Sequence, residues 1–357
     1  MRVMRGIICP VVYSFAFDSV ASFVWALSRG RKLSLPTLVV GLATIAFAVT
    51  GCALTSWKST FGRNHPLTGR IWDVSAARFI DRQNLISSLA GAHFVLLGEK
   101  HDNPDHHRLQ AQLLRGLIAV GRRPAVGFEM FDVDDDAAIA DHLAVAPNDA
   151  AGLGRAVNWD NRGWPNWAMY QPIAEAALDA KLRIVATNLP LATARKMRRD
   201  GPAALEPRMG REEGIDQPLP EAMFADIEAD IRNSHCGYGS EKSVKAMVGI
   251  QRARDAQMAQ SLIAASVPDG AVLVAGAGHV RNDYGIPVYL GAKAADKRTL
   301  SIAFVEVDMR KTEPQIYAAE YRNARLPFDY VWFTPRVDDE DPCEKFKTQF
   351  KRLEKAQ

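Results

Sequence analysis

The stretch His93-Phe94-Val95-Leu96-Leu97-Gly98-Glu99-Lys100-His101 decides the fold class of this chain. Its apolar residues are consecutive, which is typical of a strand that is buried on both faces of a sheet. Three further short apolar runs share this character, at 125–128, 182–186 and 271–275. Helical patterns separate the runs, at 105–121, 173–181 and 242–265. We therefore predict an α/β fold, with a mostly parallel sheet flanked by helices.

Domain boundaries follow from where this alternation starts and stops. Two stretches interrupt it, at about 132–170 and 189–240, and both follow predicted strand ends. We expect them to be helical insertions that form a smaller lid subdomain. The predicted segments are a leader (1–51), a tether with a first helix over about 75–89 (52–92), the α/β domain (93–335) and a tail (336–357).

The leader has the parts of an export signal. A basic cluster at 29–32 precedes an apolar run at 33–48, and Val49-Thr50-Gly51-Cys52 follows. This ending resembles a bacterial lipobox, which implies cleavage before Cys52 and lipidation of its thiol. The alternative is a membrane anchor, but the run is shorter than the roughly 20 residues of a spanning helix. We expect translation to start after residues 1–28, because lipoprotein signals begin just before their basic cluster.

The resemblance to a lipobox predicts a location in the cell envelope. Ala53 follows the lipidated cysteine in place of the aspartate that would indicate inner-membrane retention, so we expect the outer membrane. The leader also explains the net charge of +3, because residues 1–51 alone contribute +4. The remaining chain is close to neutral, so its charge does not indicate a nucleic-acid partner.

Two cysteines remain after processing, because Cys9 leaves with the leader and Cys52 is lipidated. Cys236 and Cys343 would then lie in an oxidising compartment, where a disulfide between them is expected. The alternative is two independent buried thiols.

Unusual polar residues follow the predicted strands. Glu99 and His101 follow the first run, Glu129 and Asn188 follow the next two, and His279 follows the last. Ligands of open α/β sheets bind at the carboxyl ends of the strands, so we expect these side chains to converge. The group Glu99, His101, Glu129 and His279 could act in acid–base catalysis. Alternatively, His101, Glu129 and His279 could bind a divalent metal ion, or each histidine could simply cap a strand.

A second candidate site lies in the two insertions. Arg162, Trp164 and Tyr170 belong to a crowded aromatic block, and His235 and Tyr238 lie at the end of the second insertion. Large rings beside tyrosine, histidine and arginine suit haem, with an imidazole or phenolate as axial ligand and arginine paired to a propionate. The alternative is that the tryptophans form the core of the small domain.

Six motifs then occur together along the chain. They are 96–107, 127–131, 164–170, 188–190, 254–259 and 275–281. This combination resembles the ChaN-like haem-binding lipoproteins from about Phe94 to Tyr330. The resemblance implies haem as ligand, iron acquisition at the outer membrane with a haem or iron receptor as partner, and a homodimer. The candidate haem ligands are Tyr170, Tyr238 and His235, and the other candidate haem contacts are Arg162, Trp164 and Arg281.

The two Gly-x-x-His motifs and Glu129 also resemble the wider superfamily of Tiki/TraB metallopeptidases and erythromycin-esterase-like enzymes. That resemblance implies metal ligation or catalysis by His101, Glu129 and His279. We therefore carry three hypotheses: a haem-binding protein, which we prefer, a metal-dependent hydrolase, and a structural lipoprotein with a relict site.

Overall fold

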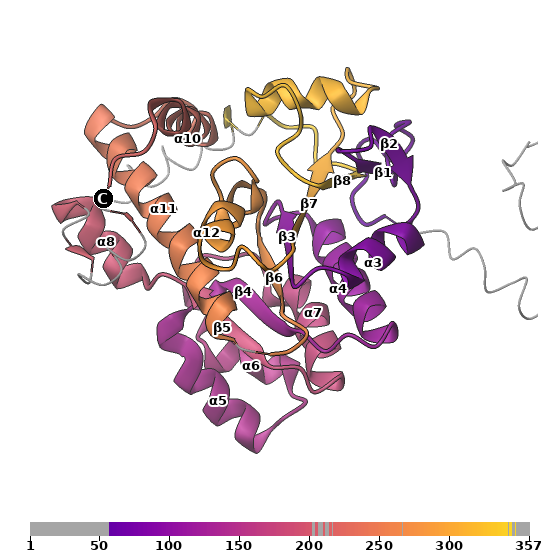
Figure 1. Cartoon of the computed structure of the whole chain (residues 1–357), viewed down its shortest axis with the longest axis vertical. Coiled ribbons are helices and arrows are strands. Elements are labelled where there is room, and N and C mark those ends of the chain that lie inside the picture. The colour runs from indigo at the N-terminus through magenta and orange to yellow at the C-terminus, as the bar shows by residue number, and fades with distance from the viewer. Residues whose placement is uncertain are drawn as a thin grey trace, which may run out of the picture. The chain divides into compact units, whose positions relative to one another are not determined.

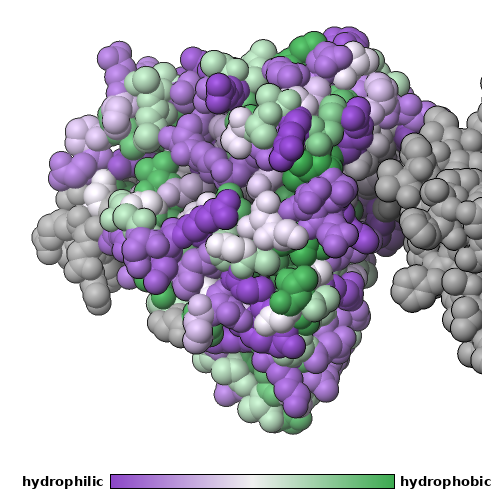
Figure 2. Space-filling model, turned by 45° about the vertical axis from the view of Figure 1, so that its right-hand side comes forward, coloured by the Kyte–Doolittle hydropathy of each residue, from purple (hydrophilic) through white to green (hydrophobic). Residues whose placement is uncertain are grey.

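The computed structural model describes residues 57–341, apart from 202, 203, 206–209, 211–213, 216 and 266, together with 343, 344 and 347. The predicted leader and Cys52 lie outside the described residues. Within them, no helix combines the length and the apolar composition needed to cross a membrane. On the face in Figure 2, hydrophilic side chains predominate and hydrophobic ones form small separate patches.

One eight-stranded sheet organises the described part of the chain, with the strand order β2-β1-β8-β7-β3-β6-β4-β5 (Figure 1). The strands from β8 to β5 in this order are parallel, whereas β1 is antiparallel to both of its neighbours. This arrangement confirms the predicted α/β class. The strands are β1 (Ile71–Asp73), β2 (Arg78–Ile80), β3 (Phe94–Glu99), β4 (Ala125–Asp132), β5 (Ile184–Asn188), β6 (Ala271–Gly276), β7 (Thr299–Glu306) and β8 (Tyr330–Thr334).

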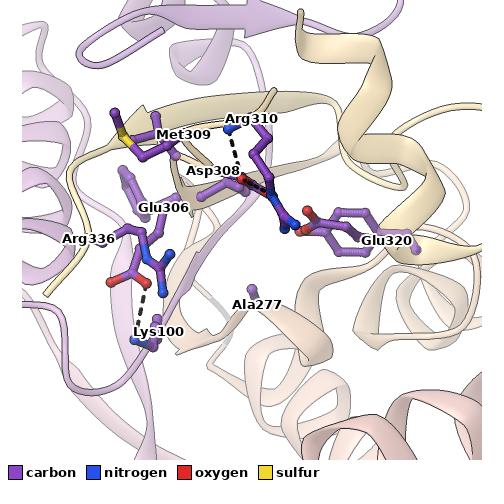
Figure 3. A pocket seen from close by; sticks show the side chains of 12 residues that line it. Lys100, Ala277, Glu306, Asp308, Met309, Arg310, Glu320 and Arg336 are labelled. Atoms are coloured by element: carbon purple, nitrogen blue, oxygen red, sulfur yellow. Dashed lines mark hydrogen bonds and ion pairs between the residues drawn. The ribbon is translucent and has the colours of Figure 1, made fainter. Parts of the chain in front are cut away.

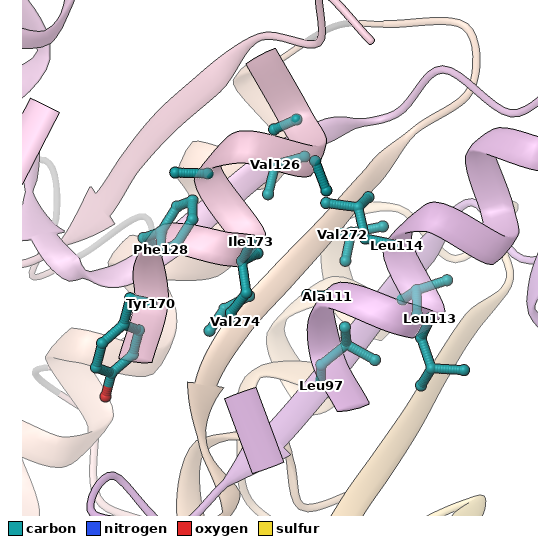
Figure 4. Packing of buried hydrophobic residues seen from close by; sticks show 14 of the residues in the cluster. Leu97, Ala111, Leu113, Leu114, Val126, Phe128, Tyr170, Ile173, Val272 and Val274 are labelled. Carbon is teal, nitrogen blue, oxygen red and sulfur yellow. The ribbon is translucent and has the colours of Figure 1, made fainter. Parts of the chain in front are cut away.

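Two layers of helices cover the sheet because each central strand is apolar on both sides. In β3, Val95 and Leu97 belong to the core beneath one layer, and Phe94 and Leu96 belong to the core beneath the other. The first layer comprises α3 (Arg82–Ala90), α4 (Pro104–Ala119) and α7 (Trp167–Asp179), and the second comprises α11 (Glu241–Ala264) and α12 (Ile286–Lys293). Figure 4 shows the first core, where side chains of α4 and α7 pack on β3, β4 and β6.

The first helix differs from its predicted position over 75–89. The chain instead forms the β1–β2 hairpin, and α3 begins only at Arg82. Asp81 fixes this start, because its side chain accepts a hydrogen bond from the backbone N–H of Asn84 at 2.7 Å.

The two insertions differ from each other. The first contains α5 (Asp136–Val145) and α6 (Ala150–Ala156), with short 3-10 turns η1 (Val133–Asp135) and η2 (Trp159–Asn161). Its aromatic residues Trp159 and Trp167 belong to the main core, so this stretch is not the separate lid that the sequence predicted. The second contains α8 (Leu191–Asp200) and α10 (Glu221–Ser234), which pack on α11 through two small clusters of their own.

Candidate functional site

The carboxyl edge of β3 and β6 has the topology of a ligand-binding edge. These two strands are parallel neighbours, and the helices that follow them lie on opposite faces of the sheet. Strand β3 leads into α4. Strand β6 leads into α12 through the 3-10 turn η4 (Ala277–Val280). Connections that diverge in this way leave an opening between the two strand ends. The Gly-Glu-Lys-His and Gly-Ala-Gly-His segments both begin at this point.

Glu99 ends β3 and orients His101. One carboxylate oxygen of Glu99 lies 2.7 Å from Nδ1 of His101 and accepts a 3.3 Å hydrogen bond from the Tyr170 hydroxyl. The other oxygen is buried and has no hydrogen-bond partner in the described structure. Burial lowers the pKa of His101, but the carboxylates of Glu99 and Glu129 outweigh it and raise the pKa to about 9. Glu99 therefore holds a charged imidazole at the strand end.

Glu129 lies within β4 and is the most fully bonded carboxylate of the cluster described here. One oxygen accepts a hydrogen bond from the backbone N–H of Gly276 at 2.6 Å, and the other accepts one from Nη2 of Arg254 at 2.7 Å. Nε2 of His279 lies 3.3 Å from that second oxygen. Burial raises the pKa of Glu129, but His279 and Arg254 outweigh it and hold the pKa well below its usual value. Glu129 is therefore a fixed anion at neutral pH.

His279 lies in η4 between two carboxylates. Its Nδ1 is 2.5 Å from Asp255 of α11, opposite the contact of Nε2 with Glu129. Burial lowers the pKa of His279, but Glu129 and Asp255 outweigh it and raise the pKa to about 9. The pKa of Asp255 rises to about 6, because the side chain is buried. We call Glu99, His101, Glu129, Asp255 and His279 the strand-end cluster.

Gly276 lets the two halves of the cluster approach each other. A Cβ atom at this position would lie 3.2 Å from the His101 ring and 3.5 Å from Glu129. An aromatic side chain also contacts this point, because the ring centroid of Trp164 lies 4.9 Å from that of His101. The edge therefore brings together Glu99, His101, Glu129 and His279, as predicted, with Asn188 bonded to Arg254 at 3.0 Å.

The metal prediction gains no support from this geometry. Among the described residues, no three His, Cys, Asp or Glu side chains are arranged to hold a metal ion. Both ring nitrogens of His279 already face carboxylates of the cluster. The arrangement instead supplies proton donors and acceptors of contrasting acidity.

Three predicted haem contacts are buried or ion-paired within the protein. Tyr170 is fully buried beside His107, and burial together with Glu99 raises its pKa far above the usual value, so it is not presented as a phenolate ligand. Arg162 is held by both oxygens of Asp135. Arg281 is buried and engaged by Asp230 and Asp283. Both guanidinium groups are occupied by partners that the sequence pattern did not reveal.

His235 and Tyr238 lie in the turn between α10 and α11. Tyr238 is 42% exposed, and the Nδ1 atom of His235 lies 2.8 Å from the Ile231 carbonyl. This contact orients the imidazole ring. An oriented imidazole and an exposed phenol are donor types that haem iron accepts. This turn therefore fits haem better than Tyr170 does.

A disulfide fixes the same turn. Cys236 is joined to Cys343, as expected from the sequence, with 5.4 Å between their Cα atoms. Cys236 has φ +55° at the end of α10, where glycine is usually found, and the N–H of Gly237 donates to the Arg232 carbonyl at 2.7 Å. The turn that carries His235 and Tyr238 is thus tied both to its helix and to the tail.

A protein-family model described as "Haem-binding uptake, Tiki superfamily, ChaN" matches residues 85–290. The chain belongs to the ChaN family. The matched residues include the whole strand-end cluster and the turn with His235 and Tyr238. Strands β7 and β8 and Arg336 lie beyond the match.

One solved structure shares the fold of this ChaN-family chain. It is titled "Cofacial heme binding to ChaN of Campylobacter jejuni" and has a TM-score of 0.58 and 21% identity, and the alignment covers 73% of this chain and 95% of that one. Two others are more distant. An erythromycin esterase in its open conformation has a TM-score of 0.39 and 14% identity, with 71% and 77% covered. The type III effector HopBA1 has a TM-score of 0.38 and 13% identity, with 79% and 99% covered. No curated protein matches the sequence.

Two residues that contact Glu129 and His279 were not predicted from the strand ends. Arg254 and Asp255 come from the middle of α11, and they bind Glu129 and His279 respectively. Both belong to a motif that carried the family resemblance, which was the available signal. Without that motif, charged residues on a long helix would indicate only a solvent-exposed face.

Proposed function

We propose that this protein binds haem and serves haem or iron acquisition at the cell envelope. The observation that carries the proposal is the ChaN-family match over 85–290, which spans the strand-end cluster and the α10–α11 turn. Haem would supply an iron centre and two carboxylates to be held by the protein. The chain's own task is then to orient an axial donor and to shield one face of the ring.

The turn between α10 and α11 supplies the axial donor in this proposal. Tyr238 is exposed, and the Nδ1 contact of His235 with a carbonyl orients its ring. The Cys236–Cys343 disulfide supports the turn, which limits the reorganisation needed when iron binds. We therefore propose Tyr238 and His235 as the two candidates for the axial ligand.

The envelope location is part of the same proposal. The sequence Val49-Thr50-Gly51-Cys52 supports lipidation of Cys52, and Ala53 supports the outer membrane. A homodimer and an outer-membrane receptor for haem or iron are the proposed partners. Labelling cells with a clickable fatty acid tests the anchor, because Cys52→Ser should abolish labelling of the protein.

A haem titration of the chain from Ala53 onward tests the ligand. We expect a saturable Soret band at micromolar protein, with size-exclusion chromatography before and after addition to report dimer formation. Tyr238→Phe and His235→Ala, each measured separately, should identify the axial donor by a shift of the band. A flat titration of well-folded protein would refute haem binding.

The strand-end cluster supports hydrolysis as the alternative function. Buried imidazoles and carboxylates whose pKa values move in opposite directions are typical of acid–base sites. Hydrolysis of a panel of chromogenic esters and amides, compared between wild type and His279→Gln, would test it. A chelator control separates metal-dependent from metal-independent turnover.

A further inference from the structure

A hollow lies beside the strand-end cluster. It has a volume of about 640 Å³ and is lined by residues from the ends of β3 and β7, from η4 and from the chain after β8. Lys100, which lines it, directly precedes His101, and Ala277, which also lines it, lies two residues before His279. Figure 3 shows Lys100, Glu306 and Arg336 along one wall and Asp308, Arg310 and Glu320 along the other, with Ala277 between them. We call this hollow the β7 pocket.

Most charges of the β7 pocket are already paired. Glu306 accepts hydrogen bonds from Lys100 at 3.1 Å, from the side chain of Asn103 at 2.8 Å and from the backbone of Val337 at 3.0 Å. Asp308 is held by Arg310 at 3.1 Å. These contacts leave both acidic side chains satisfied.

Arg336 is the exception. Its guanidinium lines the pocket and is half-buried, and no carboxylate among the described residues pairs with it. Its backbone is held in place, because its N–H donates to the Phe61 carbonyl at 2.8 Å in an isolated antiparallel bridge. A half-buried guanidinium on a fixed backbone is a site for an anion, since its N–H donors form a fork that matches a carboxylate.

Apolar side chains border the same position. Phe61 is 39% exposed and Met309 is 62% exposed. Phe304 and Val307 also line the hollow. A ligand that places a carboxylate on Arg336 could therefore rest an apolar body on this border.

We propose that the β7 pocket binds a carboxylate, with Arg336 as its partner. The carboxylate belongs either to haem, in which case the inference rests on the proposed function, or to a small organic acid. Arg162 and Arg281 cannot take this role, because Asp135, Asp230 and Asp283 hold them. By contrast, no carboxylate in the described part of the chain pairs with Arg336.

The far wall of the β7 pocket is linked to α10, the helix that precedes the turn with His235 and Tyr238. Arg281 donates to the Tyr321 carbonyl at 3.3 Å and also pairs with Asp230 of α10. Tyr321 ends the 3-10 helix η5 (Pro314–Tyr321) and lines the pocket. One buried arginine therefore connects α10, which leads into the proposed axial-donor turn, to the proposed carboxylate site.

The test compares haem with haem dimethyl ester, which lacks free carboxylates, in the chain from Ala53 onward. Absorbance titrations use wild type, Arg336→Ala and the control Arg155→Ala, whose side chain is 75% exposed on α6. We expect Arg336→Ala to weaken haem binding by about tenfold or more, with no effect on the ester, because one charge-assisted pair is lost. Arg155→Ala should bind both compounds as wild type does.

Citrate provides the second arm, measured by calorimetry on the same three proteins. If Arg336→Ala loses citrate binding and Arg155→Ala keeps it, the result supports the pocket. If no Soret band forms in the same experiments, the proposed haem function fails while the carboxylate site stands. If Arg336→Ala weakens haem binding and citrate does not compete with haem, the site is assigned to the haem carboxylate. If Arg336→Ala matches wild type for haem and citrate alike, or if wild type binds neither, the carboxylate site is wrong.

Discussion

Nε2 of His279 lies 3.3 Å from Glu129, and the opposite nitrogen of the same ring lies 2.5 Å from Asp255. One imidazolium thus stands between a carboxylate of strongly lowered pKa and one whose pKa is raised to about 6. A charge held in this way couples the protonation state of the edge to the stability of the fold.

We expect the free energy of unfolding to fall between pH 6.5 and 9. Folding raises the pKa of His279 from 6.5 to about 9, so its stabilisation is fully present below pH 6.5 and is lost as the pH rises through 9. His101 acts in the same direction. Urea unfolding should show a decline that is smaller in His279→Gln by roughly 3 kcal/mol. An equal decline in both proteins would contradict this assignment.

Arg254→Met should destabilise the fold by about 3 kcal/mol, because it leaves the buried carboxylate of Glu129 without its guanidinium partner. The matched control is Arg232→Met, which removes an i,i+4 pair with Glu228 on α10, and it should cost less than about 1 kcal/mol. Chemical denaturation of both variants gives the comparison. Similar losses of stability in the two variants would show that the buried pair with Glu129 contributes no more than a surface ion pair.

Gly98→Ala should cost roughly 1–3 kcal/mol through overpacking. A Cβ at Gly98 would overlap Cγ2 of Val280 and lie 3.0 Å from the Cα atom of Ala277. Gly278→Ala is the control, because a Cβ there meets no described atom within 4 Å. Thermal unfolding of the two variants should separate them, and a Gly98→Ala protein as stable as Gly278→Ala would disprove the close approach of η4 to β3.

Tyr170→Phe should leave the Soret spectrum of the haem complex unchanged. Its hydroxyl is buried against Glu99 and does not reach a ligand surface. The same substitution at Tyr238 removes an exposed phenol and is the informative comparison. A shifted Soret band in Tyr170→Phe, with Tyr238→Phe like wild type, would reverse this assignment of donors.

Removal of the disulfide by Cys236→Ser with Cys343→Ser should lower the free energy of unfolding by roughly 2–5 kcal/mol. The bridge closes a covalent loop between residues 107 positions apart, which restricts the unfolded chain. A reducing agent should destabilise wild type to the same level and leave the double variant unaffected. If the reducing agent does not change the wild type, the bridge does not form in solution.

The central strands could be predicted because their composition alone identifies them. Phe94–Leu97 and Ala271–Ala275 are uninterrupted apolar runs, and such runs are stable only when both faces are covered. Strands β1 and β2 could not be recognised, because three residues show no period. Their hairpin overlaps the helix that was predicted over 75–89, and that prediction is wrong because Asp81 starts α3 later.

The candidate site was predictable where it depends on strand ends and not where it depends on ion pairs. Glu99, His101, Glu129 and His279 meet as the parallel topology requires. By contrast, nothing in the sequence indicates that Asp135 holds Arg162 or that Asp230 holds Arg281. Such partners come from segments distant in the chain, and only packing decides between a free and an engaged arginine.

The order of the strands also determines when the sheet can fold during synthesis of the chain. β3 pairs with β6 and β7, which leave the ribosome long after it, so an incomplete chain exposes the apolar edges of Phe94–Leu97. Nascent material would thus depend on a holding chaperone until β6 and β7 are made. An unfolded chain is also what a secretion channel needs, so this late pairing would suit a protein that folds only after export.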